Sequence, residues 1–180
     1  MTNILKNKVY VPPGVDLTFL EQNLNLKTNT ENISIKFPHS TKFVYEDRYL
    51  GVYSFKKRNC SALYGCLLRK LKKLVYGLII PHQVRLDLLG RGYTMLLQDN
   101  KIILQLGHSH DIVLDVPSTV NILIINKKAT QLLLSSYSLE DLTQFASKVI
   151  NFRKPNPYHG RGIIWLGKPF RRKELKKKNN

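Results

Sequence analysis

The sequence predicts an α+β fold of two tandem, duplicated units, each a small antiparallel-rich sheet with one packed helix, plus a basic C-terminal extension. In the first half of the chain, short alternating apolar runs are followed by a helical apolar stripe, and the same order recurs in the second half. With 180 residues, 43% of them hydrophobic, the chain is long enough for two small cores. We predict an N-terminal domain at 1–81, a C-terminal domain at 82–152 and the extension at 153–180.

Strands are expected first in the N-terminal domain. Apolar and polar residues alternate there in short runs, which are separated by turn signals such as Pro12-Pro13-Gly14. These runs predict a small antiparallel sheet. Its expected strands are 9–11, 24–26, 33–37 and 48–55.

A helix is expected next. Apolar residues are spaced by threes and fours, at positions 60, 63, 64, 67, 68, 71, 74, 75 and 78, as on one face of an α-helix. Gly77 and Pro81 end the pattern, and the opposite face carries Arg69, Lys72, Lys73 and Tyr76. Cys60 and Cys66 lack the spacing of a zinc site, so we expect both to pack in the core.

The C-terminal domain repeats this plan. Its expected strands are 84–89, 93–97, 102–106, 112–116 and 120–125, and a helix follows at 138–152. Ser138 and Asp141 resemble a capping box at the start of that helix. Leu71 of the first helix, with Leu67, and Phe145 of the second, with Val149, are predicted core residues.

The charge of the chain points to a polyanionic partner. The formal net charge is +17, and residues 151–180 contain ten Lys and Arg against the single acid Glu174. A second cluster, Lys56, Lys57, Arg58, Arg69, Lys70, Lys72 and Lys73, contains no acid. Nucleic acid is the expected partner, and an anionic membrane surface is the weaker alternative. A membrane span is not expected, because the longest uncharged stretches run about eleven residues, short of the roughly 20 that a spanning helix needs.

No residue pattern predicts catalysis, a metal site or a cofactor. His108-Ser109-His110-Asp111 lacks further ligands at metal spacing, so a polar turn is the favoured interpretation. Gly90-Arg91-Gly92-Tyr93 is too short for a phosphate-binding loop and opens a strand instead of a helix. We therefore expect neither an enzyme nor a bound cofactor.

The segment from residue 153 onward is predicted to be a binding arm. Prolines keep 153–157 out of the preceding helix, and Phe152, Tyr158, Trp165 and Phe170 are interleaved with basic residues. Gly160 and Gly162 are expected to let the backbone approach RNA closely. We expect stability to come mainly from residues 8–152 and RNA affinity from the arm.

Four motifs carry a resemblance to a known family. The segment 156–163 (NPYHGRGI), followed by Arg171-Arg172-Lys173, resembles the C-terminal signature of the bacterial-type large-subunit ribosomal protein L-six (universal L-six) family. Gly90-Arg91-Gly92-Tyr93, the segment 106–110 (LGHSH) and the segment 11–15 (VPPGV) are similar to its other motifs, in the same order. The match covers nearly the whole chain.

The resemblance implies a structural constituent of the large ribosomal subunit that binds rRNA near the sarcin–ricin loop and the factor-binding region, supporting translation. Its partners would be large-subunit rRNA and neighbouring large-subunit ribosomal proteins, with no homo-oligomer. A non-ribosomal RNA-binding regulatory protein is the alternative. The residues expected to bind rRNA are Gly90, Arg91, Gly92, Tyr93, Arg153, Lys154, Tyr158, His159, Gly160, Arg161, Gly162, Lys168, Arg171, Arg172 and Lys173.

The sequence also departs from the family pattern near its start. The basic N-terminal start is reduced to Leu5-Lys6-Asn7-Lys8, and a glycine–proline–lysine–glycine turn is replaced by residues 27–31, so the resemblance does not extend to an rRNA contact by the first domain. The chain has 20 Lys against 9 Arg, 14 Asn and only 3 Ala, which indicates an A+T-rich gene. With no visible presequence, we expect an organelle-encoded protein of the mitochondrial matrix, in the mitoribosome, with the plastid as the alternative.

Overall fold

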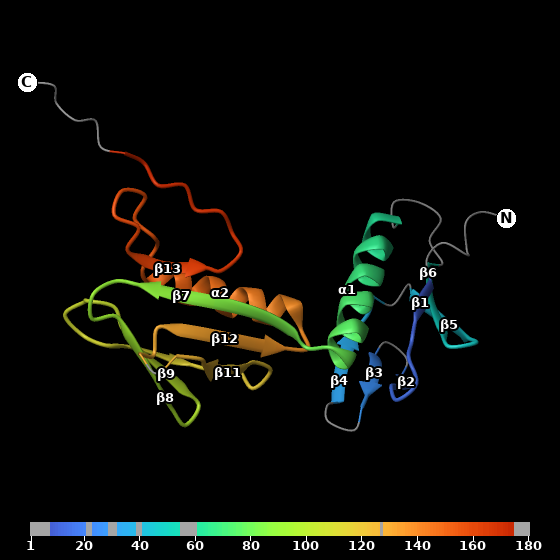
Figure 1. Cartoon of the computed structure of the whole chain (residues 1–180). Coiled ribbons are helices and arrows are strands. Elements are labelled where there is room, and N and C mark those ends of the chain that lie inside the picture. The colour runs from blue at the N-terminus through green and yellow to red at the C-terminus, as the bar shows by residue number, and fades with distance from the viewer. Residues whose placement is uncertain are drawn as a thin grey trace, which may run out of the picture. The chain divides into compact units, whose positions relative to one another are not determined.

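The computed structural model of the chain describes residues 8–20, 23–28, 32–38, 41–54, 61–126 and 128–174 (Figure 1). The chain divides into two compact units, Met1–Ile80 and Pro81–Asn180. Some sequence predictions fall outside the described residues: the N-terminal Leu5-Lys6-Asn7, Asn29–Glu31 of the replaced turn, Cys60 with the cations at 56–58, and the basic residues from 176 onward.

In its described residues, the first unit contains two three-stranded antiparallel sheets and one helix. The buried residues come from both sheets and from the helix, and Leu24, Leu26, Leu50 and Leu71 are fully buried. One sheet has the order β1-β6-β5 and the other β2-β3-β4. The elements are β1 (Lys8–Tyr10), β2 (Asp16–Leu20), β3 (Asn23–Lys27), β4 (Asn32–Lys36), β5 (Thr41–Glu46), β6 (Tyr49–Ser54) and α1 (Ser61–Ile79).

The expected strands of this unit correspond to β1, β3, β4 and β6, but β2 and β5 were not predicted. Strand β3 shows why the alternation was informative: Leu24 and Leu26 are buried while Asn23 and Asn25 are half-buried, as the two faces of a strand require. In β5 (TKFVYE) most residues are exposed, so no clear alternation marks it. Its place is set by pairing with β6, from Thr41 opposite Ser54 to Glu46 opposite Tyr49.

Helix α1 buries the central part of the predicted stripe, whose positions 60, 63 and 64 lie outside the side chains that the structure describes. Leu68, Leu71, Leu74 and Val75 are buried, Leu67 is half-buried, and the helix contacts β1 and β6. The prediction that Cys66 packs in the core is wrong, because its side chain is exposed. Cys66 precedes Arg69 by three residues and Lys73 by seven, a spacing that places it on the basic face of the helix.

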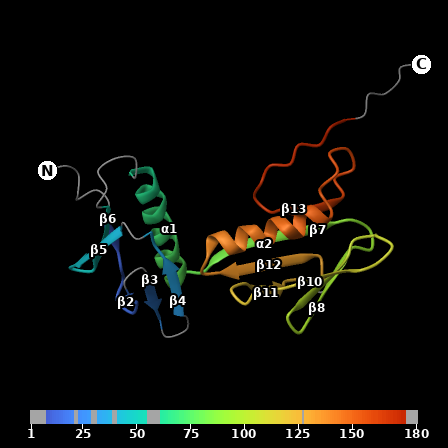
Figure 2. The same cartoon turned by 180° about the vertical axis from the view of Figure 1, so that it is seen from behind.

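Over 81–126 and 128–174, the second unit contains a four-stranded and a three-stranded sheet, both antiparallel, and helix α2. The four-stranded sheet has the order β11-β12-β7-β13, and the other has the order β10-β9-β8. Helix α2 packs against β7, β12 and β13, and Figure 2 shows it lying along this sheet. The elements are β7 (His82–Leu89), β8 (Thr94–Gln98), β9 (Lys101–Gln105), β10 (Ile112–Asp115), β11 (Asn121–Ile124), β12 (Gln131–Ser136), α2 (Leu139–Phe152) and β13 (Gly162–Trp165).

The start and the buried face of α2 confirm the sequence prediction. Ser138 is the N-cap, and its side-chain oxygen accepts a hydrogen bond from the Asp141 backbone N–H at 3.3 Å. The buried residues of α2 are Leu142, Phe145, Ala146 and Val149. They include both residues that the sequence assigned to the core of this helix.

Two strands of the four-stranded sheet were not predicted. Strand β12 pairs with β7 along six residues and lies between β7 and β11. Strand β13 pairs with the other edge of β7, with Ile163 opposite Leu88. Because Ile163 is 0% exposed and belongs to the core, the expectation that residues after 152 lie outside the core is wrong for this strand.

Across the residues that the structure describes, neither helix combines the length and apolar character needed to cross a membrane.

Candidate nucleic-acid interface

Tyr93 joins three of the sequence motifs. It follows the turn after β7 and is only 7% exposed. A Cβ at Gly90 would lie 2.5 Å from the Tyr93 ring, and one at Gly107 would lie 3.4 Å from it, so both glycines leave room for the ring. The Arg153 side chain donates from Nε to the Tyr93 hydroxyl at 3.1 Å. Tyr93, predicted to bind RNA, therefore holds the Gly90 turn, the Gly107 bend and the start of the arm together.

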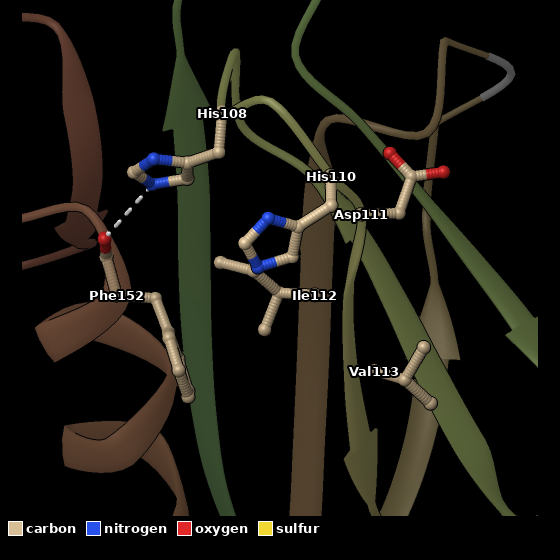
Figure 3. Close-up of a pocket in the computed structure, with 6 residues that line it drawn as sticks. All are labelled: His108, His110, Asp111, Ile112, Val113 and Phe152. Atoms are coloured by element: carbon tan, nitrogen blue, oxygen red, sulfur yellow. Dashed lines mark hydrogen bonds between the residues drawn. The ribbon is translucent and has the colours of Figure 1, made fainter.

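The bend after β9 makes a further contact with the end of α2. His108 Nε2 lies 3.4 Å from the carbonyl oxygen of Phe152, and the ring points toward that oxygen (Figure 3). Because a carbonyl only accepts, Nε2 is the donor. Both residues line a surface pocket, together with His110, Asp111, Ile112 and Val113.

This pocket does not have the grouping of a metal site. The Asp111 carboxylate points away from His108 (Figure 3). It accepts a hydrogen bond from Gln105 Nε2 at 3.0 Å. Within the described ranges, no three His, Cys, Asp or Glu side chains are grouped closely enough to hold a metal ion. The bend between β9 and β10 is the polar turn that the sequence predicted.

The arm begins with a hairpin-like loop, residues 153–163, which we call the arm hairpin. The Ile163 backbone N–H donates to the Arg153 carbonyl at 2.9 Å, and the Asn156 N–H donates to the Arg161 carbonyl at 2.8 Å. These bonds pair the two limbs of the arm hairpin, and its second limb continues directly into β13. The arm hairpin is therefore anchored at both ends, by α2 and by the four-stranded sheet.

The tip of the arm hairpin is ordered by Asn156. Its side-chain oxygen accepts from the backbone N–H groups of Tyr158, at 2.8 Å, and His159, at 3.3 Å. Its carbonyl accepts from the Gly160 N–H at 2.8 Å. Tyr158 is 48% exposed at this tip. Asn156 was not among the predicted site residues, although its Asn-Pro sequence is a signal for such a turn.

Gly160 and Gly162 serve the packing of the chain itself. Gly160 has φ +69°, and a Cβ there would lie 2.7 Å from Nε of Arg172. Gly162 has φ +142°, and a Cβ there would lie 2.6 Å from Cα of Pro155. The Arg172 guanidinium lies beside Gly160, and backbone of residues 154 and 155 lies beside Gly162, so both glycines let the arm pack on itself; a close approach of RNA to them stays a prediction.

The following basic segment, residues 166–174, folds back along the arm hairpin (Figure 1). The Lys173 N–H donates to the Pro157 carbonyl at 2.9 Å, and the Arg172 guanidinium lies beside Gly160. Lys168 Nζ lies 4.1 Å from the centre of the Trp165 ring, in a cation–π contact. The two basic stretches of the arm therefore form one surface.

The charged side chains on this surface are nearly all cationic, and most of them are exposed. Among residues 153–174 the sequence has seven Lys and Arg and one acid, Glu174. The structure thus separates the predicted site residues into two groups. Tyr93, Gly160 and Gly162 are buried and support the fold, and Arg153 is half-buried. The exposed cations are Arg91, Lys154, Arg161, Lys168, Arg171, Arg172 and Lys173.

Known proteins match this chain in sequence, over the same segments. The family model for ribosomal protein L6 matches residues 89–164, which contain the Gly90 turn, the Gly107 bend and the whole arm hairpin. The large ribosomal subunit protein uL6 of Rhodopseudomonas palustris strain BisB5 is 30% identical over 179 residues, covering 99% of this chain and 100% of that protein. The chain belongs to the ribosomal protein L6 (uL6) family.

Other relatives match over the same extent. The uL6c protein of Phaeodactylum tricornutum is 29% identical, covering 96% of this chain and 97% of its own length. The uL6 protein of Fervidobacterium nodosum is 26% identical, covering 98% of this chain and all of its own. The family suggested by the four motifs is thus confirmed. Membership of this rRNA-binding family gives the chain a structural role in the large ribosomal subunit.

Proposed function

We propose that the chain binds large-subunit rRNA near the sarcin–ricin loop, close to the factor-binding region, and so supports translation as a structural constituent of the subunit. The observation that carries this proposal is the arm surface. Motifs separated by about 60 residues in the sequence meet at Tyr93 and Arg153 and present one group of exposed cations. Neighbouring ribosomal proteins would contact the remaining surface.

The surface suits an RNA backbone for physical reasons. Lys and Arg neutralise phosphates and release counterions, and Arg can bind a phosphate with two parallel hydrogen bonds. Tyr158 offers an exposed ring on which a base or a sugar can stack. Because backbone hydrogen bonds already order the arm hairpin, little conformational entropy remains to be lost on binding.

We assign the contacts to the exposed residues of the arm and the Gly90 turn. Gly90, Gly92, Tyr93, Arg153, Gly160 and Gly162 position these residues and need not touch RNA themselves. The contact residues are Arg91, Lys154, Tyr158, His159, Arg161, Lys168, Arg171, Arg172 and Lys173.

The test is sedimentation followed by footprinting. The chain should sediment stoichiometrically with the large subunit. It should leave the subunit only in strong salt washes, because each contact with a phosphate releases counterions and so steepens the dependence of affinity on salt. Large subunits carrying Arg161→Ala together with Arg171→Ala should lose chemical protection at the sarcin–ricin loop. Sedimentation with other RNA, away from the subunit, would instead support a non-ribosomal regulator. Protection unchanged in the variant would refute the assigned site.

We further propose that the ribosome is mitochondrial. Relatives among uL6c and bacterial uL6 proteins fit an organellar ribosome. The Lys- and Asn-rich, Ala-poor composition supports an A+T-rich organelle gene, and the replaced turn at residues 27–31 supports a divergent mitochondrial member over a plastid one. Mass spectrometry of ribosomes purified separately from mitochondria and plastids decides between the two. Peptides found only in plastid ribosomes would overturn the mitochondrial assignment.

A further inference from the structure

Helix α1 of the first unit presents a basic face that the interface above does not use. Leu68, Leu71, Leu74 and Val75 fill the buried side of this helix. The exposed side carries residues that follow one another at helical spacing, and Tyr76 among them is 54% exposed. These exposed residues are Arg69, Lys72, Lys73 and Tyr76.

The charge on α1 is of one sign. Its 19 residues contain no Asp or Glu, so no carboxylate within the helix offsets its cations. Arg69 lies three and four residues before Lys72 and Lys73, the spacings at which like charges on a helix repel each other. Helix α2 differs in this respect, because its first turn carries Glu140 and Asp141. The sign of this charge is complementary to that of a polyanion.

The spacing and composition of the face fit a phosphate backbone. A helix rises 1.5 Å per residue, so Arg69 and Lys73 are separated by about 6 Å along the axis, and Arg69 and Tyr76 by about 10 Å. A row of cations of this length can contact neighbouring phosphates, and Tyr76 extends the row with a ring that can stack on a sugar or an unpaired base.

We propose that the exposed face of α1 is a second RNA-backbone contact, made by Arg69, Lys72 and Lys73 with Tyr76 at its end. The proposal rests on the rRNA-binding function proposed above and extends it to the first unit, for which the sequence resemblance gave no rRNA contact. A lipid surface is the poorer match, because most of the apolar side of α1 is buried in its own unit, and among its described large hydrophobic side chains only Tyr76 and Ile79, near the end of the helix, stay exposed to insert into a bilayer.

The first measurement is the salt dependence of binding of the full chain to deproteinised large-subunit rRNA. The variant Arg69→Gln/Lys72→Gln/Lys73→Gln is compared with a control, Lys27→Gln/Lys36→Gln/Lys148→Gln, which removes the same charge from other exposed positions. We expect the α1 variant to bind at least tenfold more weakly. Its slope of log affinity against log salt should be smaller by about two, because each lost phosphate contact contributes about 0.7 to 0.9. Equal affinities and slopes for the two variants would overturn the proposal.

The arm variant, Arg161→Ala/Arg171→Ala, is measured in parallel and separates the two proposals. Loss of binding in the arm variant alone would refute the α1 contact and leave the function proposed above in place. Loss in the α1 variant alone would refute the assigned arm site instead.

A second measurement does not depend on the folding of any variant. Ultraviolet cross-linking of intact large subunits containing the unchanged protein should yield nucleotide adducts on the peptide that contains Tyr76. Cross-links from this peptide to another protein, without nucleotide adducts, would overturn the proposal and indicate an acidic protein partner.

Discussion

Ile163→Ala tests whether the arm belongs to the core of the second unit. Ile163 lies in β13 and is 0% exposed. The substitution removes three carbon atoms, worth about 0.8 kcal/mol each by transfer from water, and leaves a cavity that adds to this cost. We therefore expect the free energy of unfolding to fall by about 2–5 kcal/mol. For a domain of about 100 residues, the melting temperature should then drop by at least roughly 8 °C.

The assay can use the single tryptophan of the chain. Trp165 lies in β13 and packs against the same core, so its fluorescence reports unfolding of this unit. The matched control is Ile164→Ala, on the opposite face of the strand, where the half-buried side chain should cost about 1 kcal/mol or less. Equal losses for the two substitutions in chemical denaturation would refute the placement of β13 in the core.

Three further predictions concern folding and binding. Leu71→Ala should lower the free energy of unfolding by about 2–5 kcal/mol, because the side chain is fully buried, whereas Lys72→Ala on the exposed side should change it by roughly 0.5 kcal/mol or less. Similar melting temperatures for the two variants would contradict the helical stripe. Arg161→Ala should weaken rRNA binding by about 1 kcal/mol or more, because one charge-assisted contact is lost. Filter binding at fixed salt measures this, and an unchanged affinity would remove Arg161 from the proposed interface. Gly160→Val should destabilise the arm hairpin by about 1–3 kcal/mol, because its φ of +69° disfavours a β-branched residue and the Arg172 guanidinium would have to move away. A melting curve like that of the unchanged protein would contradict this strain.

Much of the fold could be predicted because its signals are local. The apolar stripes of both helices repeat every three to four residues, so they are visible without knowing what the helices pack against. The cap at Ser138 depends on a residue only three positions away. Alternating strands such as β3 are visible for the same reason, since each side chain shows which face it takes.

The missed strands depend on partners far away in the sequence. In β12, three consecutive leucines, 132–134, show no alternation, and the strand is defined by pairing with β7 more than 40 residues earlier. Strand β13 is a four-residue apolar run between basic segments, and only the open edge of β7 makes it a strand. Neither pairing can be recognised from the local sequence pattern. The sequence therefore predicted an extension where the apolar run of β13 lies.

The same distinction between local and distant information explains how much of the candidate site could be predicted from the sequence. The sequence singled out segments that the structure brings together, because cations, glycines and aromatic residues are concentrated in them, but it could not show which of these residues are exposed and which are buried. Tyr93 and Arg153 are 60 residues apart, and only the structure shows that the arginine donates to the tyrosine. A glycine motif beside basic residues therefore predicts where a surface lies, whereas the structure shows which atoms of the chain itself lie beside each missing Cβ.

The continuity of the arm hairpin with β13 also determines which experiments can separate binding from folding. Arg153 donates to a buried tyrosine, and its carbonyl accepts from Ile163 in the core strand. A chain ending at Phe152 would thus lose the arm cations and an edge strand of the main sheet together, and its failure to enter large subunits would not identify the cause. Substitution of exposed cations such as Arg161 leaves these hydrogen bonds and the core in place. A loss of rRNA affinity in such variants, at an unchanged melting temperature, can be attributed to the contact itself.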